Sequence, residues 1–434
     1  MIINFNSKEN NKILNILFLS IPAALLLPLN FSNIFCIIYL LTGFYFLRKY
    51  DVNIKTDILD KILFFFFCII ITSSLIEIII NNDSIIENLS LNILNKVSVI
   101  RFFFIYWLTK NILQHNLIKI KNFFKVSLFC ITFISINIIL MHLIGNDIFG
   151  NKEFANRFST IFGERAVAGT YLLNFFFFGF IYVYCLRKKN ILITFFFIFL
   201  TGLGILLTLD RMPFFLFVTF FFFICLLNLK KDYKLFIIFL ILIPIFLFLL
   251  LKYEKLLSRY SKLLSWEVKE LILISDKNNK DMQGIYSYSS IFKDSINTIF
   301  FEKTLIGSGI SSFYSRCRDF RLQTDKMSAI HGYAYACPKH THHLYLEILI
   351  AGGVLGFTTF VIVIIIKFFV LIRNILTQKN AYYTLHTILL TAFLVEIFPL
   401  RSYGNIFNSY NGLFFFFKIS IIYCIIKYNF FKLK

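Results

Sequence analysis

The feature that most constrains this chain is a series of apolar stretches, each about as long as an α-helix that crosses a lipid bilayer. Such a helix needs about 20 predominantly apolar residues. About twelve stretches qualify, near residues 13–29, 32–47, 62–80, 93–109, 123–144, 166–186, 191–209, 212–229, 235–251, 343–366, 381–399 and 411–428. Only 15% of the residues are charged, which excludes an ordinary soluble protein. The sequence therefore predicts an all-α polytopic integral membrane protein with about 12 transmembrane helices.

The spacing of these stretches divides the chain into three parts. Residues 1–251 hold the first nine predicted helices, residues 252–342 form one long hydrophilic loop, and residues 343–434 hold the last three helices. The N-terminal segment MIINFNSKENNK leads into an apolar stretch that no small-residue cleavage site follows. We therefore expect the first helix to be retained rather than removed as a signal peptide.

The distribution of positive charge predicts the orientation of the chain in the membrane. The net charge is +21, which in a soluble protein would suggest nucleic-acid binding. Here the cations form short clusters between apolar stretches, at 48–61, 110–125, 187–189, 230–234, 367–379 and 427–434. Because Lys and Arg gather in cytoplasmic loops, both termini are predicted to be cytoplasmic. The acidic segment 81–87 and the long loop 252–342 are then predicted to lie on the outer, periplasmic face.

Several arginines fall on the outer side of this predicted topology, where short loops normally avoid cations. They are Arg157, Arg165, Arg211, Arg316, Arg318, Arg321 and Arg401. The planar, permanently charged guanidinium suits carboxylate and phosphate groups. A converging set therefore predicts an anionic substrate, with a diphosphate as the natural candidate. The alternative is that each arginine anchors a helix at the interface or pairs with a nearby acid, such as Glu153, Glu164 or Asp210.

A histidine cluster precedes the tenth apolar stretch and lies on the same predicted face. It comprises His340, His342 and His343, in the segment KHTHHLYLEILIAGGVLGF. A neutral imidazole can accept a proton from a sugar hydroxyl near neutral pH, but the same spacing could also bind zinc or cap a helix. Gly353 and Gly356, which lie one helical turn apart, are interpreted as sites of close helix packing.

Cys317 and Cys337 are the only cysteines in the long loop. In an oxidising periplasm we expect them to form a disulfide bond, worth about 3 kcal/mol for a closed loop of roughly 20 residues. This bond would bring the segment 316–321 next to the histidines, whereas free thiols are the alternative. The other cysteines lie in apolar stretches and are expected to pack as small hydrophobic residues.

Several motifs resemble, in order and spacing, those of the O-antigen ligase and polymerase superfamily. The spacing from His342 to Gly353 is similar to the family's His-Asn, nine residues, Gly pattern, with His343 in place of the usual Asn. Asp210 stands where a small hydroxyl residue is common in the family. The resemblance extends over roughly residues 150–410. Further similar segments are Arg157–Gly163, Thr208–Arg211, Leu305–Gly309 and Pro399–Phe407.

This resemblance implies transfer of a glycan from undecaprenyl diphosphate to an acceptor sugar at the periplasmic face of the bacterial inner membrane, with no cofactor and no required metal. In the ligases the acceptor is a sugar of the lipid A core, and in the polymerases it is the next carrier-linked repeat unit. Carried over to this sequence, His342 is the base that deprotonates the acceptor hydroxyl. The expected substrate-binding residues are Arg157, Arg165, Arg211, Arg401, His340 and His343, with the arginines holding the diphosphate.

The motifs leave ligase and polymerase open, because both reactions use the same donor chemistry. From another class, a metal or small-solute transporter with a histidine-rich outer mouth is a further hypothesis. A transporter is expected to carry ionisable residues near the midplane of its spans. The mid-span positions of this sequence are almost entirely apolar, with Glu77 and Glu396 toward the ends of spans.

Overall fold

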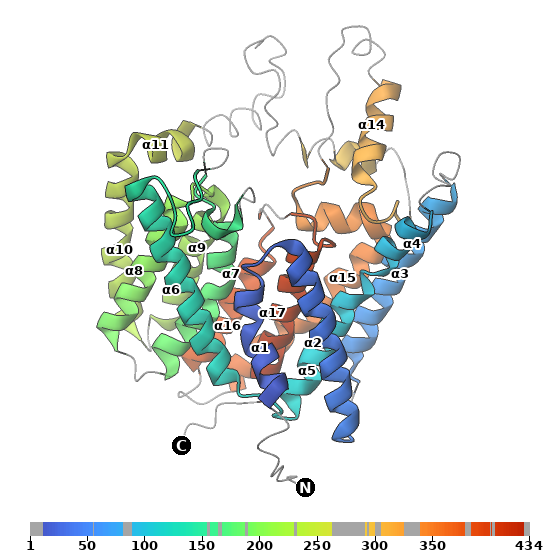
Figure 1. Ribbon diagram of the computed structural model, residues 1–434, viewed down its shortest axis with the longest axis horizontal. Coiled ribbons are helices and arrows are strands. Elements are labelled where there is room, and N and C mark those ends of the chain that lie inside the picture. The colour runs from blue at the N-terminus through green and yellow to red at the C-terminus, as the bar shows by residue number, and fades with distance from the viewer. Residues whose placement is uncertain are drawn as a thin grey trace.

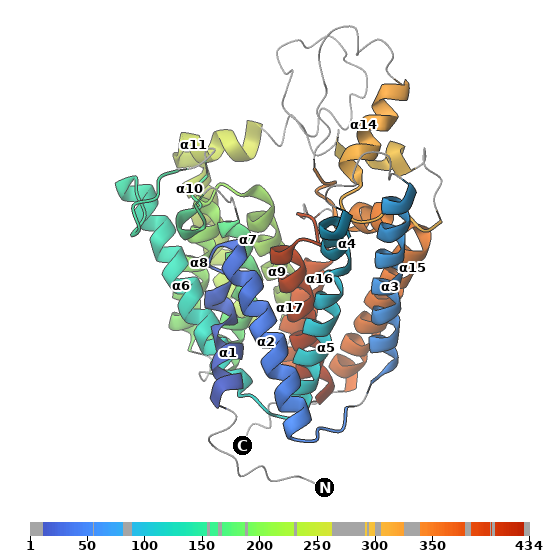
Figure 2. The same cartoon turned by 45° about the vertical axis from the view of Figure 1, so that its right-hand side comes forward.

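The structure is a computed structural model. It describes residues 12–54, 56–80, 89–153, 157–163, 167–186, 190–229, 232–262, 291–292, 295–299, 305–324, 339–377, 383–399, 401 and 404–428. Within these residues the chain forms a bundle of helices and contains no β-strand (Figures 1 and 2). The predicted all-α fold class is confirmed.

The helices follow one another along the chain with short connections in most places. The α-helices are α1 (Lys12–Ala24), α2 (Leu29–Lys49), α3 (Ile58–Ile80), α4 (Leu89–Val97), α5 (Ile100–Gln114), α6 (Ile120–Ile144), α7 (Ala168–Phe180), α8 (Ile191–Leu207), α9 (Arg211–Asn228), α10 (Tyr233–Lys252), α11 (Glu254–Leu257), α14 (Phe313–Thr324), α15 (Leu344–Thr377), α16 (Tyr383–Glu396) and α17 (Ser409–Tyr428). Shorter helical segments are η3 (Thr160–Phe162), η4 (Ile181–Leu186), which continues α7, and η5 (Ser258–Lys262), which continues α11.

The length and apolar character of these helices confirm the polytopic membrane class. In the described part of the chain, eight helices are long and apolar enough to cross a membrane, and α1, α8 and α16 are shorter apolar helices. Each predicted apolar stretch contains a helix, although the stretch 93–109 is shared between α4 and α5. The count of twelve crossings and the division into 1–251, 252–342 and 343–434 stay predictions.

The two ends of the bundle differ in what they carry. The end with α11 and α14 is called the upper face here, and the opposite end, where α1 begins, is called the lower face (Figures 1 and 2). The described helices of the hydrophilic segment between α10 and α15 therefore lie at the upper face. The turns between α8 and α9 and between α16 and α17 lie at this face too.

The centre of the bundle consists mainly of phenylalanine packed against phenylalanine. Helices α7 and α17 are almost entirely enclosed, whereas α10 is mostly exposed at the periphery. Phe176 of α7, for example, stacks on Phe197 of α8 with ring centroids 5.5 Å apart and meets Phe217 of α9 edge-on at 5.0 Å. Such offset and edge-to-face arrangements are the favourable geometries for aromatic pairs. The phenylalanine runs of the sequence thus form the packing core around which the peripheral helices are arranged.

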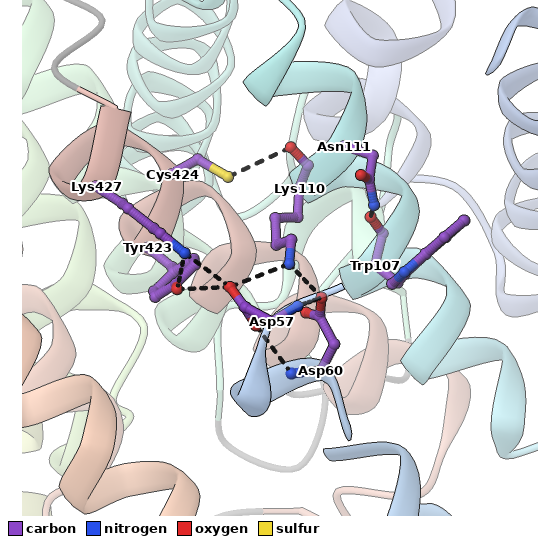
Figure 3. Close-up of polar contacts among 8 residues, drawn as sticks. All are labelled: Asp57, Asp60, Trp107, Lys110, Asn111, Tyr423, Cys424 and Lys427. Carbon is purple, nitrogen blue, oxygen red and sulfur yellow. Dashed lines mark hydrogen bonds and ion pairs between the residues drawn. The ribbon is translucent and has the colours of Figure 1, made fainter. Parts of the chain in front are cut away.

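A buried charge cluster ties three helices together at the lower face (Figure 3). Lys110 of α5 is fully buried and pairs with Asp60 of α3 and, at 3.2 Å, with Asp57. Tyr423 and Lys427 of α17 both contact Asp57, at 2.8 and 2.9 Å. A buried charge is tolerated only when it is paired. Lys110 therefore differs from the solvent-facing residue that its place in a basic cluster predicts.

Helix α15 is interrupted at Gly353, and this break positions the histidine cluster. Gly353 has φ 62° and ψ −162° inside an otherwise helical segment, a backbone region that is essentially restricted to glycine. The first turns of α15 lie across the upper face, and the remainder descends through the bundle (Figure 1). The break is where the direction of the helix changes.

The segment Leu305–Gly309 fills the break and replaces the missing helical hydrogen bonds. The backbone N–H groups of Ser308 and Gly309 donate to the carbonyls of Ile350 and Ala351, at 2.8 and 3.1 Å. A Cβ atom on Gly353 would overlap the backbone of this segment. The interpretation of Gly353 as a site of helix-helix packing is therefore wrong, because its partner is an extended loop. A Cβ atom added to Gly356, by contrast, would meet the side chain of Ile70 in α3 at 3.6 Å, an ordinary contact distance.

Candidate functional site

A cavity of about 770 Å³ lies at the upper end of the bundle between α7, α9, α10 and the turn that precedes α15. Its lining includes four arginines, two histidines and an aspartate, namely Arg157, Arg211, Arg259, Arg401, His340, His342 and Asp210. These residues come from five separate segments of the chain. The bundle therefore gathers charged groups that are far apart in the sequence at one site.

The turn between α8 and α9 supplies two of these groups. Leu209 adopts a left-handed conformation with φ 63°, and the chain then turns so that Asp210 occupies the N-cap position of α9. Asp210 pairs with Arg157, with Nη1 and Oδ1 3.0 Å apart. Arg211, the first residue of α9, lines the cavity beside this pair. The turn thus places an anionic and a cationic side chain next to each other at the cavity.

Arg259 is a cavity residue that the sequence-based predictions omit. It lies in η5, just beyond the end of α10, and lines the cavity together with Tyr260. Its neighbour Tyr260 donates a hydrogen bond to the carbonyl of Leu206 at 3.3 Å, which holds η5 over the end of α8. The rule that selects the other arginines, a cation on the predicted outer side, applies to Arg259 as well.

Arg401 lines the cavity but is largely enclosed and internally paired. Its Nη1 lies 2.9 Å from Oε2 of Glu396, and Nη2 donates to Oδ1 of Asn174 at 3.2 Å. Glu396 also pairs with Lys418, in the middle of α17. Lys418 is an exception to the expectation of apolar mid-span positions, and it is tolerated because Glu396 balances its charge. The network fixes the guanidinium of Arg401 against the cavity.

His340 and His342 lie next to each other just before the N-terminus of α15. Their ring centroids are 3.9 Å apart, and His342 has a left-handed backbone with φ 54°. Burial, with smaller contributions from the nearby His340 and Arg157, lowers the pKa of His342 to about 4. Burial also lowers the pKa of His340. Both imidazoles are therefore neutral at pH 7 and available to accept a proton.

Glu347 in the first turn of α15 holds the histidine turn in place. Its Oε2 accepts hydrogen bonds from the backbone N–H and the Oγ1 of Thr341, at 3.1 and 3.0 Å. Thr341 Oγ1 in turn accepts from the N–H of His343 at 3.2 Å. This arrangement fixes the residues on both sides of His342, whose left-handed conformation costs of order 1–3 kcal/mol unless the surroundings impose it.

Removing the carboxylate of Glu347 should therefore displace the imidazole of His342 while its chemical identity stays the same. We expect Glu347→Ala to slow turnover by about 10- to 100-fold, as a displacement of about 1 Å does for a positioned catalytic group. Glu347→Gln should retain most of the activity, because its amide oxygen can accept the same hydrogen bonds. Turnover measured at saturating substrate checks this. Equal losses in both variants would contradict a positioning role.

The structure brings together five of the predicted site residues, Arg157, Arg211, Arg401, His340 and His342. His343 lies next to the cavity without lining it, and its Nε2 is 2.6 Å from the carbonyl of Pro399. Arg165 and Cys337 lie outside the described residues. Cys317 is disulfide-bonded, and its pairing with Cys337 stays a prediction. Of the other arginines on the predicted outer side, Arg316 pairs with Glu77 and does not line the cavity.

The cavity also has a set of apolar lining residues. Phe214, Phe215 and Val218 of α9 line it together with Phe246, Leu247 and Leu250 of α10. Phe215 is 49% and Leu247 53% exposed, so these residues extend to the periphery of the bundle. In the part of the chain that the structure describes, no group of three or more His, Cys, Asp or Glu side chains could hold a metal ion.

These features define a polytopic helical membrane protein with an arginine- and histidine-lined cavity at one end and an apolar flank beside it. Residues 194–361 match the family model described as O-Antigen ligase. The match runs from α8 into α15, contains Arg211, Arg259 and His342, and supports a similarity of this part of the chain to the O-antigen ligase superfamily. No curated protein and no solved structure matches the chain.

Proposed function

We propose that the protein is a membrane glycosyltransferase of the O-antigen ligase type, which moves a glycan from a polyprenyl diphosphate carrier to an acceptor sugar. The observation that carries this proposal is the cavity, which arginines and neutral histidines line together. Four arginines and one aspartate leave an excess of positive charge, which suits a diphosphate. The O-antigen ligase match over residues 194–361 supports the same reaction class.

His342 is the proposed catalytic base. The acceptor hydroxyl attacks the anomeric carbon of the donor sugar and gives its proton to the imidazole of His342, while the bond from that carbon to the diphosphate oxygen breaks. The diphosphate leaves with the bonding electrons. A base on one side of the reacting carbon and stabilised negative charge on the other are the two requirements of this displacement. Configuration at the anomeric carbon is expected to invert, and no cofactor or metal is required.

The arginines are proposed to bind the leaving diphosphate. Arg157, Arg211 and Arg259 line the same cavity as His342, and their fixed, planar donors match phosphate oxygens. Arg401, His340, His343 and Arg165 are proposed to support substrate binding, as the family resemblance implies. Because Arg401 is already paired with Glu396, we expect its contribution to be smaller than that of Arg211.

The apolar flank is the proposed site for the polyprenyl chain of the carrier. Side chains of α9 and α10 extend from the cavity to the exposed edge of the bundle, so a lipid could enter sideways from the bilayer. This arrangement favours a lipid-linked donor, such as undecaprenyl diphosphate, over a nucleotide sugar. In this proposal the upper face lies on the periplasmic side of the bacterial inner membrane, and both termini lie in the cytoplasm.

An O-antigen polymerase is the second candidate, because its donor chemistry is the same and only the acceptor differs. In a ligase the acceptor is a sugar of the lipid A core, and in a polymerase it is a second carrier-linked repeat unit. Lys418, a buried charge within a span, gives the transporter hypothesis little support, since it is paired with Glu396. Deleting the gene should leave carrier-linked glycan to accumulate in the membrane; unchanged attachment to its acceptor would refute both transferase functions.

The role of Arg211 is tested by a change that keeps its charge. If a bidentate diphosphate contact matters, we expect Arg211→Lys to lower the transfer rate nearly as much as Arg211→Ala, by about 10-fold or more. Initial rates in isolated membranes check this, with Arg318→Lys as the control. Arg318 is also at the upper face, but its side chain is 61% exposed and pairs only loosely with Asp319. Full activity of Arg211→Lys would indicate a simple charge anchor.

A further inference from the structure

Asp210 lies among the arginines of the cavity, so a diphosphate bound by these arginines would lie next to its carboxylate. It is the only carboxylate among the described residues that line the cavity. Its side chain is 9% exposed and lies 3.0 Å from Arg157. It also accepts a hydrogen bond from the backbone N–H of Gly169 at the start of α7. An acid at this point reduces the positive charge that would attract an anionic ligand.

Among the described residues, several charged or titratable groups surround Asp210. Arg157, Arg259 and Tyr260 act on it electrostatically from two other segments, and Arg211 follows it in the chain. The packed ends of α7 and α8 add Gly169 and Thr208, neither of which titrates. Arginine keeps its charge in proteins, and burial raises the pKa of Tyr260. His342 and His340 also line the cavity.

We propose that Asp210 is the counter-ion of the arginines in the empty cavity and that it takes up a proton when the diphosphate of the donor binds. Donor binding is then linked to proton uptake. The inference rests on the proposed function, because it assumes that the arginines bind a diphosphate. Two anions in one small cavity repel each other, and protonation of the carboxyl group removes that repulsion. The protonated carboxyl can still accept a hydrogen bond from Arg157.

The direction of the pH dependence follows from the environment of Asp210. Burial raises its pKa to about 6, and Arg157 and Arg259 oppose that rise. In the empty cavity the carboxyl is therefore mostly ionised at pH 7. A bound diphosphate raises the pKa further, since a nearby anion disfavours the charged form. The bound state thus holds more protons than the free state, so donor affinity should increase as the pH falls from the bound-state pKa toward about 6, and it should level off below that pH.

The test is binding of a lipid-linked diphosphate sugar to the purified full-length protein in nanodiscs. The probe is a short polyprenyl diphosphate with a sugar on its second phosphate, because a diphosphate substituted at both ends keeps a constant charge over this pH range. For the wild-type protein we expect about tenfold tighter binding at pH of about 5.5 than at about 7.5. Asp210→Asn, an uncharged isostere, should bind about equally at both pH values and as tightly as the wild type at the lower one.

The control is Glu153→Gln, which removes a carboxylate that pairs with Lys255 and lies outside the cavity. It should keep the wild-type pH dependence. Calorimetry of the wild type in buffers of different ionisation enthalpy should show proton uptake on binding at neutral pH. Wild-type binding that is independent of pH would overturn the role of Asp210, and so would an Asn variant that binds weakly with an unchanged pH dependence. Absence of probe binding by the wild type at either pH would instead refute the diphosphate site itself.

Discussion

Replacing His342 with alanine should abolish glycan transfer while donor binding is retained. His342 is the proposed proton acceptor, and loss of a general base typically lowers a rate by about 10²- to 10⁴-fold. Its imidazole is neutral at pH 7, because burial lowers its pKa to about 4, so the wild-type protein holds the base in the proton-accepting form. Turnover at saturating donor and a separate binding measurement distinguish loss of catalysis from loss of affinity.

The matched control for this prediction is His142→Ala. His142 is half-buried near the end of α6, contacts Phe158 edge-on at 5.4 Å and does not line the cavity. Its loss should leave turnover within about twofold of the wild type, as is usual for substitutions away from a functional site. If His342→Ala transfers glycan at the wild-type rate, the assignment of the base is wrong, even if the rest of the site is correct.

Replacing Gly353 with alanine should destabilise the protein severely and inactivate whatever fraction folds. A side chain there would overlap the segment Leu305–Gly309, whose backbone replaces the broken helical hydrogen bonds of α15. The backbone region that Gly353 occupies costs other residues of order 1–3 kcal/mol even without an overlap. Because the first turns of α15 carry the histidine turn, His342 should move as well.

The unfolding temperature of the detergent-solubilised protein and its transfer rate measure these two consequences. Gly356→Ala is the control, because Gly356 is helical and a Cβ there would meet Ile70 at 3.6 Å, an ordinary contact. We expect the control to keep nearly the wild-type unfolding temperature and rate. A Gly353→Ala protein as stable and active as the control would show that the break in α15 does not depend on glycine.

The length of the apolar stretches predicted the helices well, because the bilayer demands long runs of apolar residues and satisfied backbone groups. The same topology argument led from sequence to Arg157, Arg211 and Arg401, since alternating spans return widely separated turns to one face. The structure brings these three arginines to a single cavity. Asp210 was anticipated only as a possible pairing partner of an arginine.

Side-chain pairing and backbone geometry were beyond the reach of the sequence. Lys110 is indistinguishable in sequence from a topology-determining lysine, and the pairing that allows Lys418 to lie within a span is visible only when its acidic partner in another helix is known. The left-handed break at Gly353 depends on a loop more than forty residues earlier in the chain, and a His-to-Gly spacing alone cannot reveal it. Arg259 followed the same rule as the other arginines but lay in a segment without a matching motif.

The central claim is that this cavity transfers glycan from a polyprenyl diphosphate, and proteoliposomes test it most directly. Purified protein would receive a carrier-linked glycan and, in parallel, either lipid A core or a second carrier-linked unit as acceptor. Our account predicts a longer glycan on one acceptor, release of carrier diphosphate, and loss of both with His342→Ala. Transfer to lipid A core identifies a ligase, and transfer to the carrier-linked unit a polymerase. Failure of the wild-type protein to transfer glycan to either acceptor, although it binds the donor, would contradict the account.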